Sequence, residues 1–387
     1  MGIFQRNNSS FYSPFAERRF QSRVERRMVR FDWTIAVLVL VLMGIGIMNL
    51  YSAVAGYPER QVLFSAQMRW FVACMILMVP IYLINYHFYE ATAPWAYAMT
   101  SVFLLLTLFF GRVLHGSSRW LNIGGFSFQP SEFSKIALVL ILARYFAANP
   151  KHGGYTLREL KFPLTLMLVP TALIFFEPDL GTALIHVLIF LSIAVFVGLD
   201  KKTVAAVVGF VLLIAPIGWF FLLKDYQKSR ILTVIDPSVD PQGAGYQITQ
   251  SAVAIGSGKF FGKGYLQGTQ TKLRFLPEQH TDFVFSVLSE EWGLIGAVLV
   301  LALFFLLIAW GLSVASNSKD RFGSIAAFGL AAMLFWHVII NIGMALGLMP
   351  VVGVILPFFS YGRTAVFSML CVVTLLLNIS SRRYIFE

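Results

Sequence analysis

The first long apolar stretch of the chain, residues 33–54, reads WTIAVLVLVLMGIGIMNLYSAV and contains no charged residue. A helix needs about 20 apolar residues to cross the hydrocarbon core of a bilayer, which is about 30 Å thick. The apolar part of a cleavable signal peptide has only about 7–15 residues. The stretch is long enough to cross the bilayer and too long for the apolar part of a signal peptide, so it predicts an uncleaved membrane helix.

The composition extends this prediction to the whole chain. Of its 387 residues, 58% are hydrophobic and 13% are charged, whereas about 25% of the residues of a soluble domain are charged. This composition predicts an all-α, polytopic integral membrane protein. We expect ten transmembrane helices, at residues 33–54, 67–86, 91–110, 131–148, 162–176, 180–198, 203–223, 284–313, 324–347 and 355–379.

Basic residues cluster at the ends that ten spans would place on one side of the membrane. Seven arginines precede the first span, and Lys or Arg residues follow the fourth, sixth, eighth and tenth. Positive charge in short loops marks the cytoplasmic side. We therefore predict two cytoplasmic termini, with a basic segment at 1–32, a membrane domain at 33–380 and a tail at 381–387. This topology, or an anionic lipid substrate, explains the net charge of +11 better than nucleic acid does.

A polar stretch of nearly sixty residues, 224–282, then lies on the outer side as a large loop between the seventh and eighth spans. Loops of that length are uncommon unless they are functional. Glu278, His280 and Asp282 end the stretch, and ionisable groups at a membrane edge are costly unless they are paired or used. Asp282 could serve as a general base, bind a divalent cation or cap the eighth helix. Its two neighbours favour function over capping.

Two more polar groups border apolar runs. Glu132 and Lys135 lie three residues apart and share a helical face. They either neutralise each other or place a cation in a cavity. Glu177, Pro178 and Asp179 separate two short spans, as a polar turn or as the edge of a cavity.

Glycines are frequent from Gly243 to Gly268. Glycine lets backbone amides approach a phosphate closely, but ordinary turns explain the same residues. Near the tenth span, Arg363 should face a cavity or a partner carboxylate.

Together these motifs resemble the SEDS family of bacterial cell-wall polymerases, and the matches extend over nearly the whole membrane region. Residues 268–270 and 275–278 are more similar to the elongation-type branch of the family than to the division-type branch. Arg363-Thr364 departs from the family, which usually has Gly-Ser or Gly-Gly there. The matching positions, in family order, are Arg119-Trp120, Gln129 to Glu132 with Lys135, Glu177 to Gly181, 243–251, 254–258, Pro277-Glu278 with His280 to Phe283, and Pro357 with Ser360-Tyr361-Gly362.

The resemblance implies a peptidoglycan glycosyltransferase that polymerises lipid II, a disaccharide-pentapeptide on undecaprenyl pyrophosphate. Asp282 matches the essential aspartate of the family and would be the general base, alone or with a divalent cation such as Mg²⁺ or Mn²⁺. Lys135, Arg119 and Arg230 would stabilise the leaving pyrophosphate. Glu132 and Asp179 would orient those cations or hold the metal. The remaining expected substrate contacts are Trp120, Gln247, Glu278, His280 and Ser360.

The resemblance also implies the setting. We expect a multi-pass protein of the bacterial cytoplasmic (inner) membrane, with its active site on the extracytoplasmic side. The expected partners are a class B penicillin-binding protein that supplies transpeptidation, the elongation machinery and membrane lipids, but not nucleic acid.

Two other functions fit a polytopic chain with polar sites. A lipid II flippase or another transporter would use Asp282 and Lys135 for gating or proton relay, although transporter sites usually lie near the bilayer midplane. A non-catalytic scaffold for wall synthesis would tolerate replacement of Asp282, which a polymerase would not.

Overall fold

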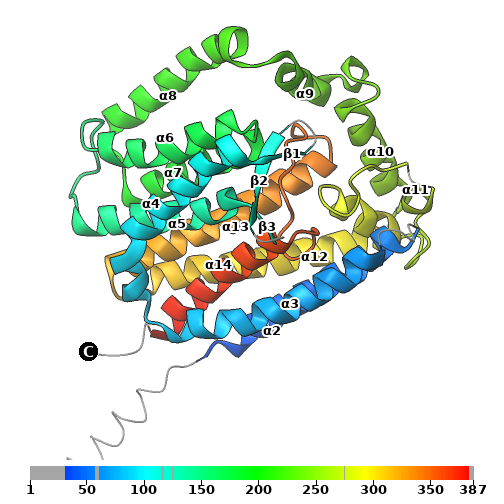
Figure 1. Cartoon of the computed structure of the whole chain (residues 1–387), viewed down its shortest axis with the longest axis horizontal. Helices are drawn as coiled ribbons and strands as arrows, with labels where there is room; N and C mark the ends of the chain where they lie inside the picture. The colour runs from blue at the N-terminus through cyan, green and yellow to red at the C-terminus, as the bar shows by residue number, and fades with distance from the viewer. Residues whose placement is uncertain (1–30, 57–60, 115–116, 124–125, 274, 383–387) are drawn as a thin grey trace, which may run out of the picture.

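The computed structural model describes residues 31–56, 61–114, 117–123, 126–273 and 275–382. Most of the predicted basic segment at 1–32 and of the predicted tail at 381–387 lies outside these residues. Within the described ranges the chain is overwhelmingly helical, which confirms the predicted fold class (Figure 1).

Seven helices of the described residues are long and apolar enough to cross a membrane. Three more helices occupy expected spans without meeting that standard: α5 (Pro130–Ala148), α6 (Lys161–Phe176) and α8 (Lys201–Ile217). The last two are shorter, and α5 carries three charged residues. The count of ten spans and the cytoplasmic termini therefore stay predictions. The seven long helices are α2 (Trp33–Ala55), α3 (Gln61–Leu83), α4 (Tyr86–Phe110), α7 (Leu180–Val197), α12 (Val284–Ser316), α13 (Arg321–Ala345) and α14 (Arg363–Arg382).

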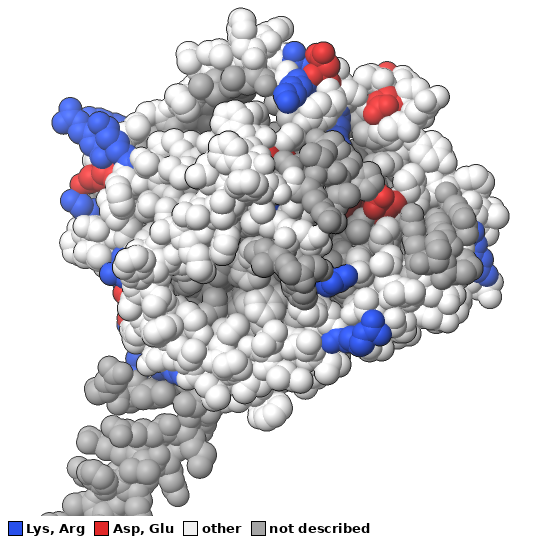
Figure 2. Space-filling view, viewed as in Figure 1, with Lys and Arg blue, Asp and Glu red and all other residues white. Residues whose placement is uncertain are grey.

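Helix α13 is central to the molecule and packs against α5, α7, α12 and α14. In α14, 94% of the apolar window is buried by protein, whereas in α3 and α4 only 22% is. The outer helices therefore present apolar side chains to lipid. Figure 2 agrees, because most of the visible face is free of Lys, Arg, Asp and Glu.

The predicted outer segment at 224–282 contains several short helices, and its position outside the membrane stays a prediction. It contains α9 (Asp225–Ile235), the 3-10 turn Pro237–Val239, α10 (Ala244–Ser257) and α11 (Thr269–Lys272), and a π-helical turn, Gly218–Leu222, precedes it. Figure 1 shows α8 and α9 at the rim of the molecule, while α10 packs on α12. The hydroxyl of Ser251 on α10 donates to the carbonyl of Ala345 at 2.5 Å, which ties this segment to α13.

A small antiparallel sheet accompanies the helices. In the described residues its strands are β1 (Arg112–Leu114), β2 (Ser117–Ile123) and β3 (Phe126–Phe128), in the order β1-β2-β3. The sheet joins α4 to α5 and carries Arg119 and Trp120 on β2.

The predicted tenth span begins too early. Residues 351–362 form a buried, non-helical segment, and α14 begins only at Arg363. The backbone φ is +72° at Gly353 and +67° at Phe358, values incompatible with a right-handed helix. Below, residues 346–362 are called the α13–α14 loop.

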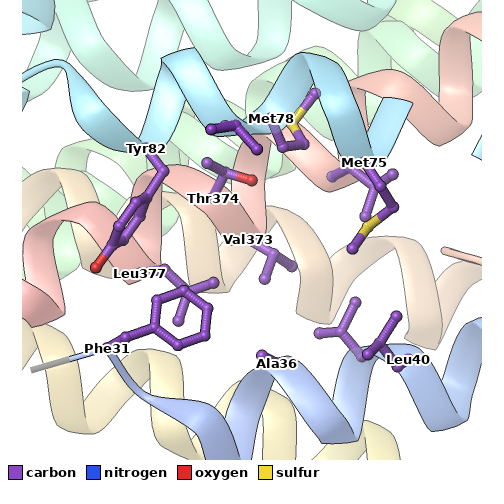
Figure 3. A pocket seen from close by; sticks show the side chains of 12 residues that line it. Phe31, Ala36, Leu40, Met75, Met78, Tyr82, Val373, Thr374 and Leu377 are labelled. Carbon is purple, nitrogen blue, oxygen red and sulfur yellow. The ribbon is translucent and has the colours of Figure 1, made fainter. Parts of the chain in front are cut away.

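An apolar cavity of about 180 Å³ lies between α2, α3 and α14 (Figure 3). Phe31, Met75, Tyr82 and Val373 are among its lining residues, all of which are uncharged. A pyrophosphate would find no counter-charge on these described walls, so the candidate site is elsewhere.

Candidate active site

Asp282 lies in the turn that precedes α12. The amides of Thr281, Asp282 and Phe283 all donate to the carbonyl of Glu278, at 3.1, 3.0 and 3.3 Å. The N-cap of α12 is Phe283, and among the described residues no side chain caps this end. The capping interpretation of Asp282 is therefore wrong.

Asp282 has an unusual electrostatic environment. Burial, and then the negative charge of Glu278, raise the pKa of Asp282 to about 6. The positive charges of Arg119 and Arg230 oppose this rise. A carboxyl with this pKa is mostly ionised at neutral pH, yet it accepts a proton more readily than an ordinary aspartate does.

The two arginines are held by backbone carbonyls. Arg119 on β2 donates from Nη2 to the carbonyl of Pro178 at 2.7 Å. Arg230 on α9 donates from Nη1 to the carbonyl of Val351 at 3.1 Å. A methyl group placed on Gly353 would lie 3.6 Å from Oδ2 of Asp282 and 3.8 Å from Nη1 of Arg119. The carboxylate and a guanidinium therefore converge on the same glycine.

The turn at residues 177–179 supplies two buried acids. Asp179 lies 3.6 Å from Nε of Arg119 and also caps α7 by accepting from the amide and the hydroxyl of Thr182, at 3.2 and 3.0 Å. Glu177 is fully buried, and neither of its carboxylate oxygens has a hydrogen-bond partner among the described residues. Burial, and then the charge of Asp179, raise the pKa of Glu177 to about 8. Glu177 is therefore mostly neutral at pH 7.

Lys135 belongs to a different, enclosed network. Its Nζ donates to Oε1 of Glu132 at 2.8 Å and to Nε2 of His337 at 2.9 Å, and its side chain is 1% exposed. Ser368 donates to the other oxygen of Glu132 at 2.8 Å. His186 lies beside this network, with Nε2 2.8 Å from the hydroxyl of Ser134. In this arrangement Lys135 is satisfied by protein, and its predicted contact with pyrophosphate has no support from the geometry.

Sequence reasoning missed His186, His337 and the role of Glu177. The two histidines stand alone in apolar helices, so no local pattern distinguishes them. For Glu177, the signal was available in the two acids that flank Pro178.

The other predicted contacts lie in the Asp282 turn, on β2 and on α10. Glu278 accepts from the hydroxyl of Thr281 at 3.1 Å, and His280 lies with its ring 6.2 Å from that of Tyr361. Trp120 and Gln247 are half-buried on β2 and α10.

Ser360 is only 2% exposed. Its hydroxyl donates to the carbonyl of Thr281 at 2.5 Å and accepts from the amide of Leu356 at 2.8 Å. Both of these partners are main chain, so Ser360 supports the site and has no free face for substrate.

The predicted divalent cation has limited support. In the part of the chain that the structure describes, no three His, Cys, Asp or Glu side chains are grouped as metal ligands. Mg²⁺ is often bound by one or two carboxylates together with substrate phosphates. The cation therefore stays a prediction.

Comparison with known proteins adds the family. The model of the FtsW, RodA and SpoVE family, described as cell cycle protein, matches residues 32–385. The chain belongs to this family. The SEDS resemblance of the motifs is thereby confirmed, and the chain is a multi-pass membrane protein.

Two curated relatives cover nearly the whole chain. The peptidoglycan glycosyltransferase MrdB of Escherichia coli K12 is 39% identical over 358 residues, which are 92% of this chain and 95% of MrdB. The peptidoglycan glycosyltransferase RodA of Treponema pallidum is 31% identical, over 91% of this chain and 98% of that protein.

Two solved structures share the fold. A chain from a peptidoglycan synthase complex that coordinates polymerization and crosslinking superposes with a TM-score of 0.79 and 31% identity, over 92% of this chain and 98% of that chain. The rod shape determining protein RodA of Thermus thermophilus superposes with a TM-score of 0.69 and 27% identity, over 93% and 99%.

Proposed function

We propose that this chain is a peptidoglycan glycosyltransferase that polymerises lipid II during cell elongation and the maintenance of cell shape. Two relatives that match over more than nine-tenths of the chain are named peptidoglycan glycosyltransferases. The observation that carries the proposal is that Asp282, a carboxyl of raised pKa, and Arg119 both face Gly353.

In the proposed reaction, the 4-hydroxyl of the acceptor GlcNAc attacks the anomeric carbon of the MurNAc at the lipid-linked end of the donor strand. Asp282 accepts the hydroxyl proton as the new C–O bond forms. The bond between the anomeric carbon and the pyrophosphate oxygen breaks, and undecaprenyl pyrophosphate leaves with that electron pair. Because a sugar hydroxyl is a weak nucleophile, a positioned base is worth about 10²–10⁴-fold in rate.

The leaving pyrophosphate needs positive charge, which Arg119 and Arg230 supply. Preorganised cations at a developing negative charge act most strongly where water is excluded. Carbonyl groups hold one nitrogen of each guanidinium. The neutral state of Glu177 at pH 7 leaves much of the charge of Arg119 available to the substrate.

The proposed setting is the bacterial cytoplasmic membrane, with the site on the extracytoplasmic side. A class B penicillin-binding protein and the elongation machinery are the proposed partners. This proposal is supported by the similarity to a chain of a peptidoglycan synthase complex and by the two RodA-type relatives.

The test is polymerisation of purified lipid II, with the cognate penicillin-binding protein present in a form that has no polymerase activity of its own. Glycan length is read on a gel for the wild type and Asp282→Asn, with and without Mg²⁺ or Mn²⁺. Long glycans from the wild type and none from a folded Asp282→Asn variant are expected. Equal glycans from both would remove Asp282 as the base. None from either, beside an active control polymerase, would favour a flippase or a scaffold.

A further inference from the structure

The main chain that carries Asp282 is held at three consecutive carbonyl groups. The carbonyl of His280 accepts from the amide of Tyr361 at 2.9 Å. The carbonyl of Thr281 accepts from the hydroxyl of Ser360 at 2.5 Å, and that of Asp282 accepts from Nδ2 of Asn341 at 3.0 Å. These donors come from α13 and from the α13–α14 loop, nearly sixty residues or more further along the chain.

The opposite edge of the same turn is fixed as well, because its amides converge on the carbonyl of Glu278. A turn outside regular secondary structure is ordinarily free to adjust its backbone. Here both its donors and its acceptors are used, so the main chain from which the Asp282 side chain projects is fixed.

Asn341 connects this turn to the α13–α14 loop. It is fully buried on α13, and its Nδ2 also donates to the carbonyl of Val354 at 2.7 Å. Ser360 makes a similar link, since its hydroxyl also accepts from the amide of Leu356. Each side chain therefore joins the Asp282 turn to the loop, and removing either leaves buried carbonyl or amide groups without a partner.

The same loop also positions the cations. The carbonyl of Val351 accepts from Arg230, and Gly353 faces both Arg119 and the carboxylate of Asp282. A methyl group on Gly181, at the start of α7, would lie 2.5 Å from the carbonyl of Val352, so the segment that follows Asp179 is packed directly on this loop. The α13–α14 loop therefore contacts both the base and the positively charged side chains.

We propose that Asn341 and Ser360 are positioning residues for the transfer reaction. They act through the main chain of residues 281–282 and hold the carboxylate of Asp282 in register with the two arginines. The inference rests on the proposed function, but it assigns to neither residue a contact with substrate. For Ser360 it replaces the substrate contact that the family resemblance implied.

The test compares two buried asparagines of the same chain. Asn341→Leu removes the amide donor at nearly constant volume. Asn378→Leu is the matched control, because Asn378 is also fully buried and its Nδ2 donates to the carbonyls of Ile81, Tyr82 and Ile84 at the end of α3. Ser360→Ala is a milder variant of the second positioning residue. For each protein, kcat and KM for lipid II are measured, together with the melting temperature in detergent.

Both leucine variants are expected to melt at a lower temperature than the wild type. Only Asn341→Leu should lose about 10–10² in kcat, the scale expected when a reacting group is displaced by about 1 Å, with KM for lipid II changed by less than about twofold. Ser360→Ala should show the same loss of kcat to a smaller extent. Asn378→Leu should retain the kcat of the wild type.

If the wild type is active, two results would overturn the inference. The first is an equal kcat for Asn341→Leu and Asn378→Leu. The second is a raised KM with kcat retained in Asn341→Leu, which would indicate substrate contact. If Asn341→Leu does not fold, Ser360→Ala decides by the same criteria. An inactive wild type beside an active control polymerase would reject the proposed function itself and is therefore distinguishable.

Discussion

Two clusters of charged side chains in this protein differ in how completely their charges are paired. Around Lys135, each acid and base has a partner: Glu132 is bonded by Lys135 and Ser368, and His337 accepts from Lys135. Around Asp282 the pairing is incomplete, since Glu177 has no partner among the described residues and Arg119 meets Asp179 only at 3.6 Å.

The difference indicates that the two clusters have different roles. A charge in a membrane span is costly unless it is neutralised locally, and the Lys135 network is closed in that way. Where the chain leaves the span, burial and then the negative charge of Glu278 raise the pKa of Asp282, and the pairing of the nearby arginines with acids is incomplete. The closed cluster (Glu132, Lys135, His337 and Ser368) should therefore control stability. The open cluster (Asp282, Glu278, Arg119, Arg230, Glu177 and Asp179) should control activity.

The largest expected effect belongs to the open cluster. Asp282→Asn should reduce the rate of lipid II polymerisation by about 10²–10⁴-fold, the usual contribution of a general base. The melting temperature should stay close to that of the wild type, because the main-chain bonds around residue 282 do not involve the carboxylate. A large loss of stability in this variant would abolish the distinction between the two clusters.

The closed cluster should respond to Lys135→Met by losing stability. This change leaves Glu132 buried without its cation, which costs about 3–5 kcal/mol in comparable buried pairs. The readout is the melting temperature and the yield of monodisperse protein in detergent. The double variant Glu132→Gln/Lys135→Met should recover much of the loss, because replacing both charges together is often nearly neutral. A stable but inactive Lys135→Met protein would instead place Lys135 in the catalytic machinery.

Arg230→Gln tests whether Arg230 stabilises the negative charge of the leaving pyrophosphate. Removing one preorganised charge from a developing anion typically costs about 10²-fold in kcat. Lys228→Gln is the matched control on the same helix, because it removes the same charge without the bond to Val351. Equal kinetics for the two variants would show that net charge, and not the placement of Arg230, matters.

In both clusters, sequence alone could reveal only some of the residues. Asp282, Arg119 and Asp179 stand at the ends of apolar runs and within family motifs, so their importance was predictable. His337 and Asn341 lie singly on an apolar helix, and only the packing of α13 brings them to their partners. No local pattern encodes such long-range pairing.

The fold shows the same limit. Hydropathy located the long helices, because lipid exposure demands uninterrupted apolar sequence. It placed the start of the tenth span too early, since the apolar residues 355–359 are buried by protein and not by lipid. Hydropathy does not distinguish these two environments.

The pH dependence of kcat should report the charges around Asp282. A base must be ionised to act, so activity should fall as the pH drops through about 6, the raised pKa of Asp282. Arg230→Gln should move this acidic limb to higher pH, because it removes a positive charge that lowers the pKa. Glu278→Gln should move it to lower pH, since the charge of Glu278 raises the pKa. Shifts in the same direction for both variants would contradict this arrangement.

The smallest effect is expected from Glu177→Gln, which mimics the neutral state of this acid. The pKa of Glu177 is about 8 in the folded protein, above its ordinary value of 4.5, so an unfolded chain ionises first as the pH rises. The folded state should therefore lose stability between about pH 4.5 and 8. Melting temperatures at pH 5 and pH 9 should differ less for Glu177→Gln than for the wild type. Asp225→Asn, which alters an exposed carboxyl at the start of α9, should leave the difference unchanged. If Glu177→Gln showed the full pH dependence of the wild type, Glu177 would be ionised in the folded protein, and the open cluster would hold less positive charge for substrate than its geometry indicates.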